Sequence, residues 1–197
     1  MNPLPVVLGH SIAHQVVFVG PFGVGKTTAL RAVSDTEVVN TDVASSEVTA
    51  EAAAQGKTTT TTGFDYGEWR FPDGARVSLL GVPGQDRFEA MWDVTIARSS
   101  AIVLWVYGDR DPRLLECAKW LNALAQRKAV ARLAVAVTRM PPDAPDAPDA
   151  ALTPYRELLE RYHPLAPVIT ADPRRAADVM QAITMALTSP YGAIERQ

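Results

Sequence analysis

The stretch that decides the fold is Gly20-Pro21-Phe22-Gly23-Val24-Gly25-Lys26-Thr27, which matches the pattern G-x-x-x-x-G-K-[ST] at every fixed position. An apolar run at 15–19 precedes it, and a segment with apolar residues at helical spacing, 26–34, follows it. The expected order is therefore strand, loop, helix. Glycines let such a loop curl until its N–H groups point at phosphate oxygens, and the helix that it opens favours an anion at its positive end. The stretch predicts a phosphate-binding loop.

Each residue type in this loop has an expected part. The Lys26 ammonium can reach the terminal phosphates of a nucleotide, and the Thr27 hydroxyl can be a ligand of Mg²⁺. The predicted nucleotide-binding residues of this part of the chain are Gly20, Phe22, Gly23, Val24, Gly25, Lys26, Thr27 and Thr28.

Outward from the loop, strand patterns alternate with helix patterns. We expect further strands at 61–71, 76–80, 101–107, 133–137 and 167–170, and helices at 85–98, 112–127, 155–162 and 173–187. Pro72-Asp73-Gly74 predicts a hairpin between the first two of these strands. The alternation predicts an α/β three-layer sandwich, with an about six-stranded, mostly parallel sheet and one antiparallel edge strand. Its ligand is expected outside the carboxyl ends of the strands.

The organisation predicted for the chain is a single domain with a core at about residues 14 to 187. Residues 35–60 are polar and lack periodicity, which predicts a long mobile connection with a helical piece near 45–55. The repeated Pro-Asp-Ala of residues 141–148 predicts an irregular surface loop.

Composition narrows the class of protein. The chain has 197 residues, a net charge of −3, 47% hydrophobic and 21% charged residues, typical of a soluble globular protein without a general attraction for nucleic acid. Cys117 is the single cysteine, so an internal disulfide is impossible. No signal peptide, membrane-spanning run or lipidation motif is recognisable. We therefore expect a cytoplasmic protein with no direct membrane anchor.

A second motif, Gly81-Val82-Pro83-Gly84-Gln85-Asp86-Arg87-Phe88, follows the hairpin. It resembles the Asp-x-x-Gly-Gln element of Ras-like small GTPases, which implies that the Gly84 N–H meets a γ-phosphate and that Gln85 orients the attacking water. Upstream, the threonine run 58–62 before Asp65 looks like the first switch of that family. One threonine there would complete the Mg²⁺ shell, and by its distance from Asp65 the choice is Thr61, with Thr60 the runner-up.

Together these motifs resemble a bacterial Ras-like family, the MglA group, and more closely the actinobacterial conservon GTPases called CvnD. The resemblance implies a switch that binds GTP and GDP with Mg²⁺ and hydrolyses GTP. It also implies a regulatory protein partner, for which the roadblock/LC7 type is the family's example.

Three positions depart from the family pattern. Gly81 stands where Ras-like proteins have the Asp that holds Mg²⁺ through water, and Asp42, Asp65 and Asp86 are open as substitutes. Residues 138–141 stand where the family has Asn-Lys-x-Asp, so Thr138 and Arg139 are expected near the base, with Arg139 in the stacking role. Pro141 cannot accept a hydrogen bond from the base, and Asp172 is a candidate for that acceptor.

The third departure is Phe22, where Ras has glycine. A bulky side chain there is expected to crowd an arginine finger, so we predict slow hydrolysis with little response to a conventional activating protein. Two other functions stay open at this point. One is a degenerate scaffold that binds nucleotide weakly or not at all, and the other is an ATP-using P-loop protein such as a small kinase.

Several residues have a structural interpretation beside a functional one. Trp92 is equally well explained by packing against a helix and by a partner surface. Cys117 is expected to be buried rather than reactive, Trp105 and Trp120 are expected in the core, and the three histidines have no metal-binding spacing.

Overall fold

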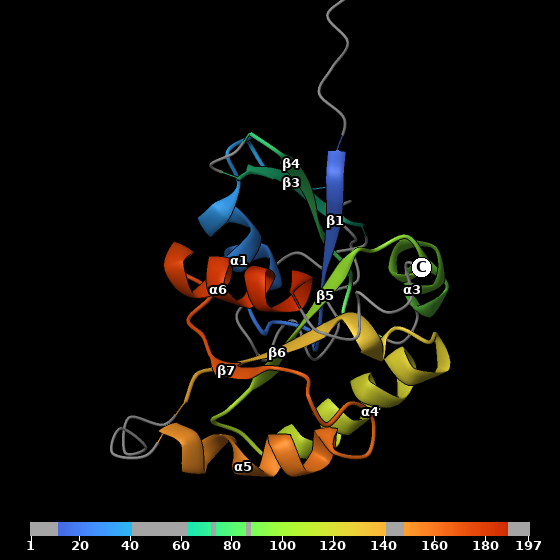
Figure 1. Ribbon diagram of the computed structural model, residues 1–197, viewed down its shortest axis with the longest axis vertical. Helices are drawn as coiled ribbons and strands as arrows, with labels where there is room; N and C mark the ends of the chain where they lie inside the picture. Colours follow the sequence, from blue (N-terminus) through green and yellow to red (C-terminus); the bar gives the residue numbers. More distant parts are fainter. Residues whose placement is uncertain (1–11, 41–62, 72–73, 86–87, 141–147, 189–197) are drawn as a thin grey trace, which may run out of the picture.

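The computed structural model describes residues 12–40, 63–71, 74–85, 88–140 and 148–188 (Figure 1). The strands are β1 Ile12–Val19, β2 Val39–Asn40, β3 Asp65–Arg70, β4 Arg76–Gly81, β5 Ala101–Tyr107, β6 Leu133–Thr138 and β7 Val168–Thr170. The helices are α1 Lys26–Val33, α3 Glu89–Ala97, α4 Arg113–Gln126, the short 3-10 helix η2 Val130–Arg132, α5 Pro148–Leu159 and α6 Ala176–Leu187.

All seven strands form one sheet in the order β2-β3-β4-β1-β5-β6-β7. Strands β4, β1, β5, β6 and β7 are parallel neighbours, whereas β3 runs antiparallel both to β4 and to β2. The prediction of a mostly parallel sheet with one antiparallel strand is confirmed. The two-residue strand β2 pairs outside β3, so the antiparallel strand lies next to the edge of the sheet.

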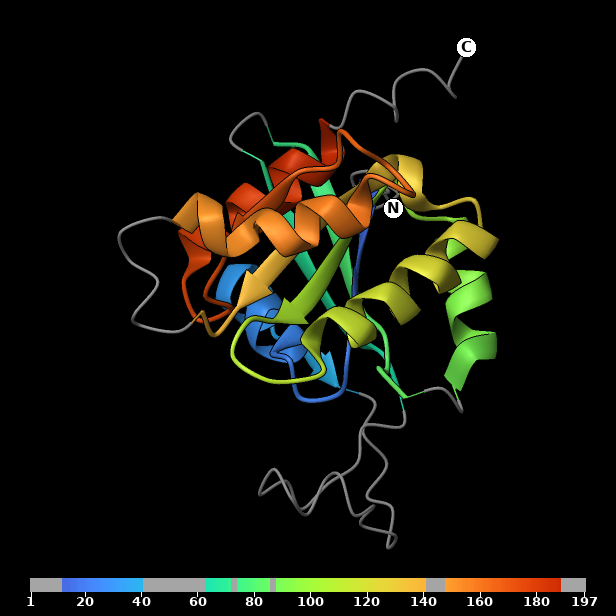
Figure 2. The same ribbon diagram turned by 90° about the horizontal axis from the view of Figure 1, so that it is seen from below.

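Helices cover both faces of this sheet, which gives the three predicted layers (Figures 1 and 2). Helices α1 and α6 pack on one face together with Val16, Phe18 and Trp105. Helices α3, α4 and α5 pack on the other face, against Val17, Val19 and the remaining side of β5. Because every residue of β5 is buried, this strand is apolar along its whole length rather than alternating.

Three helices begin elsewhere than their patterns predict. Helix α6 begins at Ala176, three residues after the predicted start. Helix α5 begins at Pro148 rather than at Tyr155 and contains Pro154. Proline suits a first turn, and burial of Leu152, Tyr155 and Leu159 along one side holds the helix despite the hydrogen bond that Pro154 cannot donate. Helix α3 begins at Glu89, several residues after the predicted start. The helical piece expected at 45–55 lies outside the described residues.

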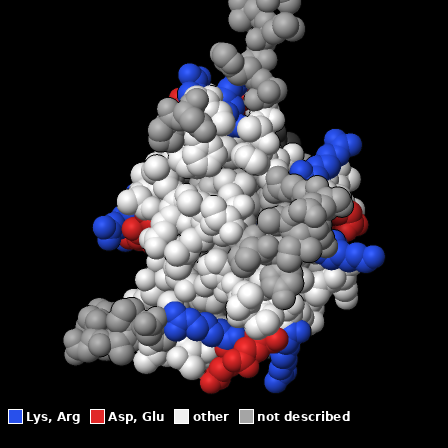
Figure 3. Space-filling model, viewed as in Figure 1, with Lys and Arg blue, Asp and Glu red and all other residues white. Residues whose placement is uncertain are grey.

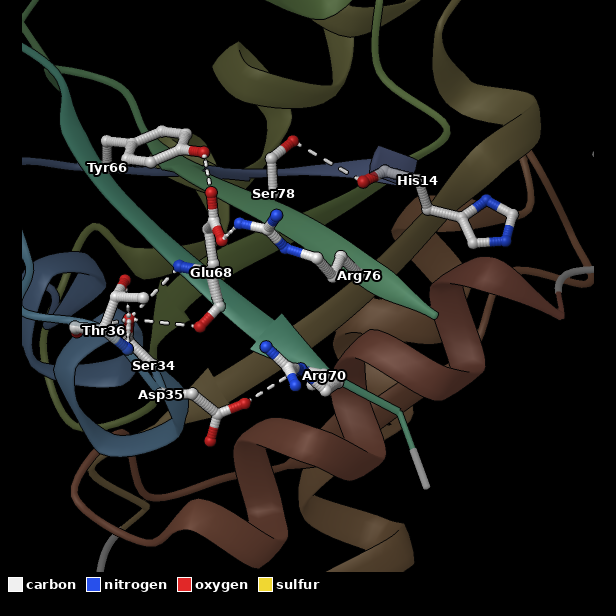
Figure 4. A network of polar contacts seen from close by, with 9 residues as sticks. All are labelled: His14, Ser34, Asp35, Thr36, Tyr66, Glu68, Arg70, Arg76 and Ser78. Atoms are coloured by element: carbon white, nitrogen blue, oxygen red, sulfur yellow. Dashed lines mark hydrogen bonds and ion pairs between the residues drawn. The ribbon is translucent and has the colours of Figure 1, made fainter. Parts of the chain in front are cut away.

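A polar network fixes the outer end of the hairpin formed by β3 and β4 (Figure 4). Glu68 accepts a hydrogen bond from the Tyr66 hydroxyl at 2.7 Å and is ion-paired with Arg76 across the strand pair. The Asp35 carboxylate, just after α1, accepts a hydrogen bond from the Arg70 backbone N–H at 2.8 Å. These contacts tie the end of α1 to β3 and so hold the hairpin beside the helix that begins at the predicted phosphate loop.

The described surface carries charges of both signs. On the face drawn in Figure 3, Lys and Arg lie at the rim, several of them beside Asp or Glu, and the white area between them shows no charged side chain. In the described part of the chain, no helix has the length and apolar character that crossing a membrane requires.

Candidate functional site

The candidate site lies where the carboxyl ends of five strands meet. Strands β1, β4, β5, β6 and β7 are parallel, so their last residues lie along one edge of the sheet. The antiparallel strand β3 begins at this edge, which brings its first residue, Asp65, to the same place. The predicted phosphate loop leaves the end of β1 and enters α1 at Lys26. The edge thus gathers residues that are far apart in sequence.

The loop depends on glycine at its two ends. Gly20 has a φ of 135°, and a Cβ there would clash with the Trp105 carbonyl oxygen, so no other residue fits. Gly25 has a φ of 113° and precedes α1 without a side-chain cap. The first N–H groups of α1 therefore keep their capacity to bind an anion, as expected for a phosphate site.

Lys26 is folded back over the loop. Its ammonium donates hydrogen bonds to the carbonyl oxygens of Gly20 at 2.7 Å and Pro21 at 2.8 Å, and the residue is 9% exposed. A buried ammonium is costly unless it is hydrogen-bonded, so these contacts hold the charge at the loop. The charge lies where an anion bound by the loop would meet it.

Two further side chains donate hydrogen bonds to backbone carbonyls of the loop. The Tyr107 hydroxyl, at the end of β5, donates a hydrogen bond to the Phe22 carbonyl oxygen at 2.9 Å. Burial raises the pKa of Tyr107, so this hydroxyl stays protonated and remains a donor. Arg139 donates to the Gly23 carbonyl oxygen at 3.4 Å, and its guanidinium lies 5.1 Å from the Tyr107 ring centre. These contacts fix the positions of two loop carbonyls and so help to hold the loop in its shape.

A cavity of about 630 Å³ opens beside this loop. It is lined by every predicted nucleotide-binding residue except Gly20, including Gly84, Thr138 and Arg139. Its size lies in the range of small-molecule sites. Gly20 instead lies under the loop as the acceptor of the Lys26 hydrogen bond. The predicted second Mg²⁺ ligand, Thr61, and its runner-up Thr60 lie outside the described residues.

The Thr27 hydroxyl donates a hydrogen bond to the Asp65 carboxylate, with 2.5 Å between Thr27 Oγ1 and Asp65 Oδ2. Both residues line the cavity, and Asp65 is 3% exposed. A hydroxyl and a carboxylate are oxygen donors of the kind that Mg²⁺ prefers. Because no group of three or more acidic, histidine or cysteine side chains gathers within the described residues, a cation here would also need phosphate or water ligands.

Gly84 and Gln85 lie against the loop. A Cβ on Gly84 would clash with the Gly20 carbonyl oxygen and lie 2.7 Å from the Phe22 backbone nitrogen, which shows how closely the two segments pack. Both polar atoms of the Gln85 amide are buried and make no hydrogen bond to the described residues. The Gln85 amide therefore retains its full hydrogen-bonding capacity beside the loop.

The end of the cavity away from Thr27 is built from β6, β7 and the start of α6. Thr138 is buried, and Arg139 adopts a left-handed φ of 53° at the end of β6. The Asp172 carboxylate lines the cavity but is bound by the Arg174 guanidinium at 2.7 and 2.9 Å, which lowers the pKa of Asp172 to about 2. Asp172 is thus an ionised acceptor that already has a cationic partner. Pro141 lies outside the described residues.

A second cavity, of about 740 Å³, lies on the other side of Phe22 and Gln85, between α3 and α4. Trp92 borders it but is only 5% exposed. Its Nε1 donates to the Pro83 carbonyl oxygen at 2.9 Å, and its ring lies 4.3 Å from that of Trp120. Of its two interpretations, packing is confirmed, and it connects α3 to the segment before Gly84. Burial raises the pKa of Cys117 to about 12, as expected of an unreactive thiol.

Sequence reasoning missed Tyr107 as a site residue. It is the last residue of an apolar strand, and a phenol at that position is the signal that could have drawn attention to it. Its contact with the loop depends on the register of β1 and β5, which the sequence does not specify.

Comparison with solved structures agrees with this architecture. The chain matches a bacterial selenocysteine-specific elongation factor, EF-Sec, with a TM-score of 0.63 and 16% identity, over 89% of this chain and 29% of that one. It matches a point variant of Era from Aquifex aeolicus, bound to GDP·AlF4⁻, with a TM-score of 0.63 and 16% identity, over 89% of this chain and 56% of that one. The chain thus spans about a third to about half of these proteins.

Searches by sequence found no matching family model and no matching curated protein. The likeness is therefore one of structure. The chain shares the α/β fold of the matched parts of these two proteins.

Proposed function

We propose that this chain is a nucleotide-dependent molecular switch that binds GTP and GDP with Mg²⁺ and hydrolyses GTP slowly. The observation that carries the proposal is the cavity that joins the loop, with its hydrogen-bonded Lys26, to the ends of β6 and β7. A phosphate site at one end and a pocket at the other is the form that a nucleotide requires. The GDP·AlF4⁻ held by Era, which has the same fold, supports this choice of ligand.

The proposed roles follow from position. The loop N–H groups and Lys26 bind the phosphates, Thr27 is a ligand of the metal, and the Gln85 amide orients the attacking water. The buried amide of Gln85, which makes no hydrogen bond to the described residues, supports this role. Mg²⁺, when bound, neutralises charge on the phosphates. Thr61 is proposed as a further metal ligand from the sequence alone.

The end of the cavity away from Thr27 supports a proposal about which base is bound. Thr138 and Arg139 line it, and the Asp172 carboxylate is the one ionised acceptor that the cavity-lining segment 170–173 brings there. We infer that Asp172 accepts hydrogen bonds from guanine N–H groups, because a carboxylate has more acceptor sites than Arg174 occupies. The site would then favour guanine over adenine, which offers no such donor at the equivalent ring nitrogen.

The whole described core is proposed to act as one domain, of about residues 14 to 187, whose two conformations are read by a regulatory protein. The resemblance to the MglA and conservon GTPases suggests that this regulatory protein is of the roadblock/LC7 type. The second cavity, which shares Phe22 and Gln85 with the nucleotide site, is where a nucleotide-dependent change would reach the surface.

Calorimetric titration with GDP, GTP, ADP and ATP, each with and without Mg²⁺, tests the proposal. Micromolar or tighter binding of GDP, strengthened by Mg²⁺, with ADP much weaker, is the expected result. Tighter binding of ADP than of GDP would assign the chain to the ATP-using class. If none of the four nucleotides bound, the remaining function would be that of a scaffold. Single-turnover phosphate release then tests the slow hydrolysis, and a rate near that of activated GTPases would contradict the crowding by Phe22.

A further inference from the structure

Gly81 and Asp65 face each other across the antiparallel pair of β3 and β4. Gly81 is the last residue of β4, and in the parallel pair of β4 with β1 its partner is Phe18, two residues before the loop begins. Residues directly opposite each other in such a pair have their side chains on the same face of the sheet. A side chain from either position therefore points toward the same region beside the loop.

The Asp65 carboxyl fills the space that a Gly81 side chain would take. A Cβ built on Gly81 would lie 3.0 Å from Asp65 Oδ2 and 3.1 Å from Asp65 Cβ. Any side chain at 81 would crowd the carboxylate that is present. There is thus room for one carboxylate at these two positions, and in this chain Asp65 supplies it.

From that space the carboxylate reaches α1. Asp65 Oδ2 accepts the hydrogen bond from Thr27 Oγ1 at 2.5 Å, so the hydroxyl proton is turned toward Asp65 and the oxygen lone pairs are left for another partner. That orientation is the one a hydroxyl needs in order to be a cation ligand. Asp65 is 3% exposed, so little water separates its carboxylate from the Thr27 hydroxyl and from a cation bound beside it.

We propose that Asp65 supplies the carboxylate of the Mg²⁺ site, in place of the side chain that Gly81 lacks. The inference rests on the proposed nucleotide function and identifies one further residue of its metal site. Asp65 acts as a positioning residue: it fixes the Thr27 hydroxyl and adds negative charge next to the metal. Of the three acidic residues that the sequence left open, Asp42 and Asp86 lie outside the described residues.

A purely structural role for Asp65 makes a different prediction. If the carboxylate only anchored α1 to β3 through Thr27, its loss would lower the unfolding temperature and leave the Mg²⁺ dependence of nucleotide binding unchanged. The measurement must therefore be of Mg²⁺ dependence rather than of hydrolysis or stability alone.

The test measures how fast a fluorescent GDP derivative leaves the full chain across a Mg²⁺ titration. The D65N variant keeps the shape of the side chain, and its Mg²⁺ half-point is expected to rise on the order of 10- to 100-fold, the effect typical of losing a group that supports a metal ligand. D35N is the matched control, because Asp35 also accepts a hydrogen bond near β3 but lies at its other end. Its half-point should equal that of the wild type.

A relocation variant makes the test specific. Since the Asp65 Cβ would itself crowd a Cβ at 81, the pair to compare is D65G with D65G/G81D. The single variant should need more Mg²⁺, and the double variant should return to within about threefold of the wild type, because one carboxylate again lies beside Thr27. If D65N fails to fold, this pair decides the matter.

Two results would overturn the inference: a folded D65N protein with the wild-type Mg²⁺ half-point, or a D65G/G81D protein that binds the GDP derivative but needs as much Mg²⁺ as D65G. Failure of the wild type to bind the derivative at all would instead refute the proposed function. The two failures are therefore distinct.

Discussion

Replacing Lys26 by methionine should weaken GDP binding without unfolding the protein. The ammonium is 9% exposed and lies 2.7 and 2.8 Å from the carbonyl oxygens of Gly20 and Pro21, so it is held where little water screens it. A unit charge about 4 Å from a phosphate charge is worth about 4 kcal/mol at an effective dielectric constant of about 20. Hydrogen bonds to charged groups measured in proteins contribute about 1.5–3 kcal/mol.

Part of that gain is offset in the native chain, because the ammonium must share its donors between the loop carbonyls and a phosphate. We therefore expect a net loss of about 2–4 kcal/mol, a roughly 30- to 1000-fold weaker GDP affinity. Methionine keeps most of the length and apolar character of the side chain, so the packing of α1 should survive.

Calorimetry with GDP and Mg²⁺ measures this loss. The matched control is K119M, which removes the same charge from an exposed position of α4. Its affinity should be that of the wild type, and thermal unfolding should show both variants folded. A folded K26M protein that binds GDP within about twofold of the wild type would refute the assignment of Lys26 to the phosphates.

Three other outcomes are expected. Q85A should slow single-turnover GTP hydrolysis at least about tenfold with GDP affinity unchanged, and an equal loss of both would place Gln85 in binding rather than in the reaction. Y107F, which removes the hydrogen bond to the Phe22 carbonyl, should lower the free energy of unfolding by about 1 kcal/mol and weaken GDP binding severalfold, whereas Y66F, which removes a hydroxyl bonded to Glu68 rather than to the loop, should leave GDP affinity unchanged. Because burial raises the pKa of Cys117 to about 12, its thiol should stay protonated and unreactive toward a disulfide reagent at about pH 8 until the protein unfolds, and stability should fall above about pH 9 as the unfolded thiol ionises; rapid modification of the folded protein would contradict this.

Much of the fold could be predicted because its signals are local. The glycine spacing of 20–27, the Asp-Gly turn at 73–74 and the apolar run 101–107 each depend on residues close together in the chain, and the structure has the loop, the hairpin and β5 where they were expected. The start of α5 could not be predicted in this way, because Pro148 closes a Pro-Asp-Ala repeat that is typical of a loop. Pro154 opposes a helix that burial of its apolar side nevertheless stabilises.

The proposed metal site could be predicted only in part for a similar reason. The sequence shows that Gly81 lacks the carboxylate expected from the resemblance, but it does not show which of three acidic residues pairs with Gly81 across the sheet. That register, Asp65 opposite Gly81, is set by the packing of the whole hairpin. Likewise, the stack of Trp92 on Trp120 requires the arrangement of α3 beside α4, and no pattern within either helix specifies it.

The central claim is that a nucleotide binds in the cavity beside Gly20–Thr27, and amide hydrogen exchange with and without GDP and Mg²⁺ tests it most directly. Slower exchange in the peptides that cover 20–28 and 136–140 is the expected result, because the bound phosphates accept from the loop N–H groups and the base covers the end of β6. GDP binding that leaves exchange in 20–28 unchanged, or protects only distant peptides, would contradict the account.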